Sequence, residues 1–184
     1  MENMHIHKEF IRKGLHAVLA MAFAVLATLV RVEVLIFIAL VLLGVFMFIR
    51  FARLHTAVHN VERVSFGELF FVVGVVVTAY VALPENVPLF QTAMLLLALA
   101  DTFAALAGIR FGTHTYHIYD EKRSFEGSFA CLVASFCVLV FFDVQYVQAL
   151  YMAVVLTAVE VVSLRGSDNL FLPVATVILF HYFV

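Results

Sequence analysis

Long apolar stretches and short polar segments alternate along the chain. The apolar stretches cover residues 15–30, 34–49, 66–83, 89–109, 127–142, 146–164 and 170–183. A helix that crosses a bilayer needs about 20 mostly apolar residues. Because several stretches are slightly shorter, their helices are expected to extend beyond the apolar cores. The pattern predicts an all-α, polytopic bundle of about seven transmembrane helices.

The composition agrees with a membrane protein. The 184 residues are 65% hydrophobic and 13% charged, whereas soluble domains are about half apolar and about a quarter charged. A soluble domain of this size could not bury so much apolar surface in one core. The first segment lacks a small-residue cleavage site, so we expect the first span to be retained. The net charge of −2 does not indicate a nucleic-acid partner.

The basic residues are distributed unevenly between the two ends of the predicted helices. Ten of the eleven Lys and Arg residues fall before the first stretch or after the second, fourth and sixth, and Arg31 alone falls on the other side. The positive-inside rule makes the first side cytoplasmic. We therefore expect a cytoplasmic N-terminus and one domain, 1–184, whose chemistry faces the cytoplasm. For a prokaryotic protein the location would be the cytoplasmic membrane.

An acidic residue lies within the fourth apolar stretch. Asp101, Ala104, Gly108 and Gly112 share one helical stripe. The small residues are typical of a packing face between membrane helices. Asp101 is different, because an acid in a span costs several kcal/mol unless it is paired or faces water. Its mid-span position predicts either an early helix end or a water-filled cavity.

The polar segment "EKRSFEG", residues 121–127, has two interpretations. Ser124 can cap a helix whose first turn contains Glu126. Alternatively, Lys122, Arg123 and nearby backbone N–H groups can hold phosphates. Next to an intramembrane acid, the second interpretation suggests a nucleotide and divalent-metal site.

Two further polar patches flank the apolar stretches. Glu160 lies inside the sixth stretch, about 7 Å along the helix from Arg165, and can pair with a basic neighbour. Asp168 or Asn169 can cap the last helix. A second patch, near the start of the chain, contains Arg12 and His16 on one helical face, typical of an interfacial anchor beside a packed histidine.

Together these patches resemble the polyprenol kinase family, which comprises dolichol kinase, phytol kinase and the CTP-dependent diacylglycerol kinases. The family pattern is close to D-x-x-A-x-x-x-G-x-x-x-G, about eight residues, then K-K-T-x-E-G. This chain matches from Asp101 to Gly127, with one extra linker residue, Arg123 for lysine and Ser124 for threonine. "RKGLH", "ERVSFGELFF" and "DNLFLP" are weaker matches in the expected order.

The resemblance implies a kinase that transfers the γ-phosphoryl group of CTP to a lipid alcohol, either an isoprenoid or diacylglycerol, with Mg²⁺. It implies catalytic roles for Asp101, Lys122 and Glu126, and metal binding by Asp101 and Glu126. The implied nucleotide-binding residues are Ala104, Gly108, Gly112, Lys122, Arg123, Ser124 and Gly127. A supporting polar wall would comprise Arg12, His16, Arg63, Glu160, Asp168 and Asn169.

Two other functions remain open from the sequence. A membrane cytidylyltransferase would use the same nucleotide and similar acidic and basic residues. A small transporter could relay protons through Asp101 and Glu160. The spacing does not distinguish CTP from ATP, and it is compatible with a homo-oligomer.

Overall fold

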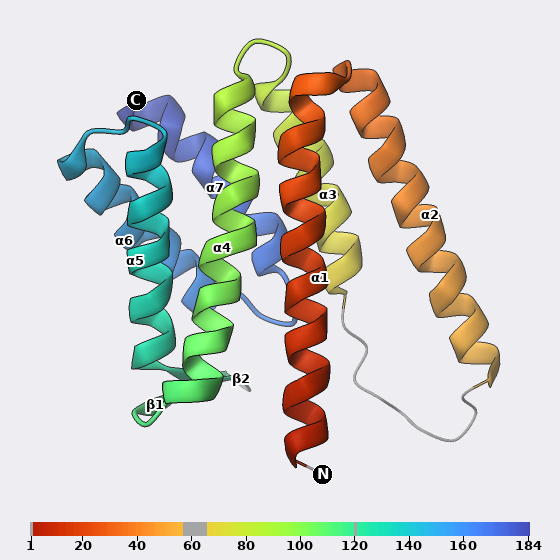
Figure 1. The fold of residues 1–184 in the computed structure, drawn as a ribbon, viewed down its shortest axis with the longest axis vertical. Helices are drawn as coiled ribbons and strands as arrows, with labels where there is room; N and C mark the ends of the chain where they lie inside the picture. The colour runs from red at the N-terminus through yellow and green to blue at the C-terminus, as the bar shows by residue number, and fades with distance from the viewer. Residues whose placement is uncertain (1, 57–65, 120) are drawn as a thin grey trace.

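The computed structural model describes the backbone of residues 2–56, 66–119 and 121–184, and the side chains of residues 13–49, 51, 66–119 and 121–184. Each of the seven apolar stretches forms one helix, which confirms the predicted helical fold (Figure 1). The helices are α1 Glu2–Leu29, α2 Val32–Thr56, α3 Gly67–Ala82, α4 Val87–Phe111, α5 Phe125–Phe141, α6 Tyr146–Val162 and α7 Asp168–Phe183.

A short β-hairpin connects α4 to α5, which the sequence did not lead us to expect. Strand β1, Thr115–Ile118, pairs antiparallel with β2, Glu121–Ser124. Tyr116 lies opposite Arg123, and His117 lies opposite Lys122. Side chains alternate between the faces of a strand, so Arg123 and Lys122 point to opposite faces. The polar segment is therefore an ordered element with one half-buried and one exposed face.

Helix α4 is at the centre of the bundle and packs against α1, α3, α5 and α7 (Figure 1). Helix α2 packs along α3 and touches α1 only lightly, so it lies at the periphery. The N-terminus and the hairpin lie at one end of the bundle, whereas the α1–α2, α3–α4 and α5–α6 turns lie at the other (Figure 1). The largest fully buried core side chains include Phe71, Phe90, Met94, Leu139, Met152 and Leu156.

Small residues allow α4 and α5 to approach closely. A Cβ atom added to Gly127 would lie 2.8 Å from the carbonyl oxygen of Ala104 and 3.4 Å from the Cα of Gly108. A Cβ added to Gly108 would lie 3.1 Å from the Ser124 hydroxyl. The α4 stripe of small residues is therefore a packing face against α5, as membrane helices commonly use.

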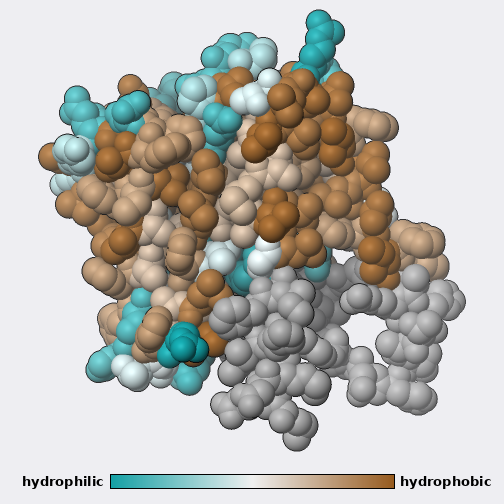
Figure 2. All heavy atoms as spheres, viewed as in Figure 1, coloured by the Kyte–Doolittle hydropathy of each residue, from teal (hydrophilic) through white to brown (hydrophobic). Residues whose placement is uncertain are grey.

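The outside of the bundle is rich in large apolar side chains. Phe37, Phe48, Phe103, Phe129 and Tyr151 are each more than half exposed. Figure 2 shows apolar residues across the middle of one face and hydrophilic residues near its upper and lower edges. In the part of the chain that the structure describes, α2 and α4 are long and apolar enough to cross a membrane. The apolar segments of the other five helices have 16–17 residues.

Candidate functional site

A buried charge cluster joins three helices. The ammonium group of Lys13 on α1 lies 2.5 and 2.6 Å from the two carboxylate oxygens of Asp101 on α4. It also donates to Asp168 at the start of α7, at 3.3 Å. The three side chains are at most one-tenth exposed. Asp101 is thus paired with Lys13, which explains how an acid is accommodated within an apolar helix.

The turn between α6 and α7 places Asp168 in this cluster. Arg165 and Gly166 both have positive φ angles, 52° and 87°, which reverse the chain sharply. Glycine adopts this region without steric cost. The Ser167 hydroxyl accepts a hydrogen bond from the Leu164 amide at 3.0 Å and closes the turn. Helix α7 then begins with Asp168 directed toward Lys13.

Among the described residues, the cluster contains two acids, Asp101 and Asp168, and one base, Lys13. Buried charges are costly unless they are paired and hydrogen-bonded, and here both carboxylates contact the ammonium group of Lys13.

Asn169 ties the cluster to α1 and α3. Its side-chain nitrogen donates to the carbonyl oxygen of Gly67 at 3.0 Å and lies 3.3 Å from Nδ1 of His16. The His16 ring packs against Phe71, with 5.6 Å between ring centroids. The Asn169 side-chain oxygen is buried and has no hydrogen-bond partner among the described residues. This oxygen can therefore still accept a hydrogen bond or bind a metal ion beside Asp168.

The hairpin carries a second ion pair. Nη1 of Arg123 lies 2.5 Å from a carboxylate oxygen of Glu160, and Nη2 donates to the carbonyl oxygen of Ser163 at 2.7 Å. Glu160 therefore pairs with a basic residue, as one interpretation predicted, but the partner comes from β2 and not from the neighbouring Arg165.

Glu126 fixes the end of α4. One of its carboxylate oxygens accepts hydrogen bonds from the Thr113 hydroxyl at 2.6 Å, and from the Thr113 and His114 amides at 3.2 and 3.1 Å. Nδ1 of His114 lies 2.9 Å from the same oxygen. These hydrogen bonds, first from Thr113 and then from His114, lower the pKa of Glu126. The described contacts of Glu126 do not include Lys122, whose side chain is exposed.

Ser124 caps α5, as the sequence predicted. Its hydroxyl accepts a hydrogen bond from the Gly127 amide at 3.1 Å. The same hydroxyl would lie 3.0 Å from a Cβ added to Gly112, at the end of α4. The cap and the close contact of α4 with α5 therefore depend on the same group.

Asp101 and Glu126 have different partners among the described residues. Asp101 pairs with Lys13, whereas one oxygen of Glu126 accepts from Thr113 and His114, just past the end of α4. The two acids do not contact each other directly in these described contacts, so a metal ion shared by them stays a prediction.

The oxygen atoms around Lys13 are of the kind that magnesium binds. Asp101 and Asp168 offer carboxylate oxygens, and Asn169 offers the unpartnered amide oxygen. Mg²⁺ prefers oxygen donors and commonly takes only one or two carboxylates, with water and substrate phosphates as its other ligands. Within the described residues no group of three or more His, Cys, Asp or Glu side chains could hold a metal. A magnesium ion at this position would thus need further ligands from a substrate.

The sequence argument missed Lys13 and included residues that the structure leaves undescribed. A buried Asp101 requires a positive partner, and "RKGLH" supplies one at the start of the first apolar stretch, which was the available signal. Arg12 lies in α1, but its side chain is outside the described set, and Arg63 lies outside the described residues altogether.

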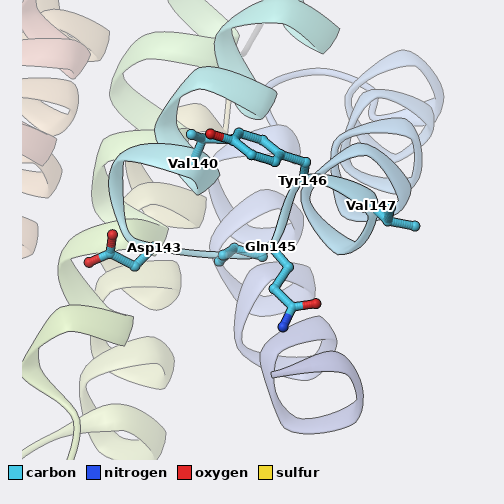
Figure 3. Close-up of a pocket in the computed structure, with 6 residues that line it drawn as sticks. Val140, Asp143, Gln145, Tyr146 and Val147 are labelled. Carbon is cyan, nitrogen blue, oxygen red and sulfur yellow. The ribbon is translucent and has the colours of Figure 1, made fainter.

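A hollow lies at the α5–α6 turn, at the end of the bundle away from the hairpin. It is lined by Val140, Asp143, Val144, Gln145, Tyr146 and Val147. Figure 3 shows Asp143 and Gln145 pointing in different directions, with no convergence of polar groups. The polar network around Lys13 and the hairpin is therefore the better candidate site.

Part of the chain is similar to a known enzyme. It is 31% identical over 134 residues to phytol kinase from Synechocystis sp., covering 67% of this chain and 57% of that protein. The chain belongs to the polyprenol kinase family. It spans less than two thirds of that relative's length. No family model matches the chain, and no solved structure matches it.

The family pattern maps onto two packed elements. Its first half, from Asp101 to Gly112, lies on α4 and at its C-cap, and its second half, from Lys122 to Gly127, covers β2 and the start of α5. The small residues of the two halves contact each other. The acid and the basic residues of the pattern therefore lie on one pair of packed helices and on the hairpin that joins them.

Proposed function

We propose that the protein is an integral membrane kinase that phosphorylates the hydroxyl group of a lipid alcohol. The observation that carries this proposal is the buried network of Lys13, Asp101 and Asp168 inside an apolar bundle, in a chain of the polyprenol kinase family. A protein without a catalytic use for it would gain little from such a cluster. Replacing buried ion pairs by apolar residues is often neutral or stabilising.

The substrates explain the architecture. A long-chain alcohol reaches the site from the bilayer, whereas a charged nucleotide comes from the aqueous side. All seven helices would cross the membrane, the shorter ones with the help of flanking residues. The hairpin and the N-terminus would face the cytoplasm, following the distribution of basic residues.

Phosphoryl transfer depends mainly on positioning and on neutralising charge. Asp101 and Asp168 would hold Mg²⁺ together with the nucleotide phosphates, or one of them would orient the lipid hydroxyl. The metal would neutralise charge that develops on the phosphates. Lys13 would neutralise these acids before the nucleotide binds, and Lys122 would contact phosphate from the exposed face of the hairpin.

Two members of the predicted nucleotide set and the predicted metal ligand Glu126 take other roles in this proposal. Gly108 and Gly127 serve the contact between α4 and α5, and Glu126 holds the α4–β1 junction in place of a metal. Their effect on the nucleotide is therefore indirect. They set where the hairpin begins and how close it lies to the charge cluster.

A phosphate-transfer assay tests the proposal. Purified protein with Mg²⁺ would be supplied with γ-labelled CTP or ATP and with phytol, a longer polyprenol or diacylglycerol. We expect label in the lipid product, CTP as the better donor, and CDP as the second product. Release of pyrophosphate with a CDP-linked lipid would instead indicate a cytidylyltransferase. Equal phosphorylation of glycerol or sugars would contradict the argument that the substrate enters from the bilayer.

A further inference from the structure

Arg123 and Lys122 are neighbours in the sequence but lie on opposite faces of β2. Arg123 shares its face with Tyr116, and both are half-buried, whereas Lys122 shares the exposed face with His117. The adjacent basic residues therefore do not form one cationic patch. Each has its own surroundings and can have its own task.

Both terminal nitrogens of Arg123 are engaged by α6 and the residue that follows it. Nη1 contacts Glu160, whose side chain is 4% exposed, and Nη2 contacts the carbonyl oxygen of Ser163, the C-cap of α6. A cation is favourable at a helix C-terminus, and an acid there is not. Arg123 thus compensates both the buried acid and the unpaired carbonyl group.

These contacts of Arg123 connect the hairpin to α6. The other hydrogen bonds near the hairpin are local to the α4–α5 connection, such as Phe125 N–H to the His114 carbonyl oxygen at 3.0 Å and Tyr116 to Ser128 at 2.6 Å. Among the described residues, the side-chain hydrogen bonds from the hairpin to α6 and its C-cap all come from Arg123.

We infer that Arg123 and Glu160 are positioning residues whose ion pair fixes the hairpin against the end of α6, so that Lys122 is held where it meets the nucleotide. This rests on the proposed kinase function for the role of Lys122. Arg123 itself does not contact phosphate. Its two terminal nitrogens are held by Glu160 and Ser163, and Arg at such a forked site is not replaceable by a simple point charge.

Amide variants separate positioning from direct phosphate binding. Arg123→Gln leaves Glu160 as a buried, uncompensated acid and releases the hairpin. We expect kcat/KM for the nucleotide to fall on the order of 100-fold, as small displacements of positioned groups do. Adding Glu160→Gln should recover part of this loss, because the unpaired buried charge is removed.

Two single variants serve as matched comparisons. Lys122→Gln removes the adjacent charge from the other face, so it should raise the nucleotide KM without loosening the hairpin. Arg165→Gln removes an exposed charge from the nearby α6–α7 turn and should change neither activity nor hairpin mobility. If Arg123→Gln and the double variant are equally impaired, Arg123 binds phosphate and the inference is overturned.

A spin label at the hairpin tip makes the test independent of kinase activity. Tyr119 is 80% exposed and connects the strands, so Tyr119→Cys in a Cys137→Ser background is a suitable site. Arg123→Gln should increase label mobility, Arg123→Gln with Glu160→Gln should reverse part of the increase, and Lys122→Gln should leave mobility unchanged. Unchanged label mobility in Arg123→Gln would overturn the inference that the ion pair fixes the hairpin. Increased mobility in a protein without kinase activity would support the anchor and reject the proposed function.

Discussion

Lys13 and Asp101, separated by 88 residues, form an ion pair in which one ammonium group contacts both oxygens of one carboxylate. The pair joins the first helix to the central helix, and Asp168 attaches the last helix to it. Lys13 thus links three helices at the polar centre of an apolar bundle. In the proposed function, the same arrangement would also collect groups that phosphoryl transfer uses.

Asp101→Asn preserves the shape of the side chain but removes its charge. We expect the variant to insert and fold while turnover falls by a factor of about 100 or more, typical of losing one strong electrostatic contact. Activity would be measured across a magnesium titration. Asp143→Asn, in the exposed α5–α6 turn where φ is 61°, is the control and should keep full activity. Wild-type activity in folded Asp101→Asn would show that Asp101 only stabilises the bundle.

Lys13→Met leaves Asp101 and Asp168 without their ammonium group. Removing one partner of a buried ion pair typically costs about 3–5 kcal/mol, so thermal unfolding in detergent should shift to lower temperature. Combining Lys13→Met with Asp101→Asn should recover part of the stability, because only one acid then remains. If both variants melt like the wild type, the cluster contributes nothing to stability.

Glu126→Gln weakens the junction between α4 and β1. The amide keeps one acceptor oxygen but lacks the charge that Thr113 and His114 stabilise, so hydrogen exchange at these two amides should accelerate. Glu121→Gln removes the same charge from β2 and should not affect them. Unchanged hydrogen exchange at these two amides in Glu126→Gln would show that Glu126 does not hold the α4–β1 junction.

Acidification should loosen the same junction in the wild type. The pKa of Glu126 is lowered in the folded protein, so its contribution to stability is present above the ordinary carboxyl pKa. The contribution is lost as the pH falls through the lower folded value. Exchange at Thr113 and His114, corrected for the intrinsic pH effect, should therefore rise only in strongly acidic buffer, and in Glu126→Gln this dependence should disappear.

Gly127→Ala tests the contact between α4 and α5. The added Cβ would lie 2.8 Å from the Ala104 carbonyl oxygen, so we expect a loss of about 1–3 kcal/mol in the free energy of unfolding, typical of overpacking. Gly14→Ala is the control. Nothing lies within 4 Å of its added Cβ, so it should gain about 0.5–1 kcal/mol from better helix propensity. Equal melting temperatures would show that the two helices separate easily.

The orientation of the bundle can be tested by labelling. The excess of basic residues at the hairpin end predicts that His114→Cys in a Cys137→Ser background reacts with a membrane-impermeant reagent only from the cytoplasmic side. A reporter fused after Val184 should be extracytoplasmic. Labelling of His114→Cys from outside would reverse the proposed orientation.

The sequence by itself determined the helices and the importance of Asp101. Seven apolar stretches predicted seven helices because their length and composition leave no other way to satisfy the backbone in an apolar environment. Ser124 was identified as a cap because its hydroxyl precedes an apolar stretch, a strictly local signal. Asp101 was found because a lone acid in such a stretch is costly wherever its partner lies.

The tertiary structure decided the partners. Lys13, Asp101 and Asp168 lie on three helices, and nothing local specifies which faces of those helices meet. The hairpin placed Lys122 and Arg123 in different surroundings, because neighbouring side chains of a strand point to opposite faces. It also gave Glu126 partners at the α4–β1 junction, Thr113 and His114, whereas Asp101 pairs with Lys13. Spacing along a chain determines geometry within an element, whereas contacts between elements depend on packing of all the helices at once.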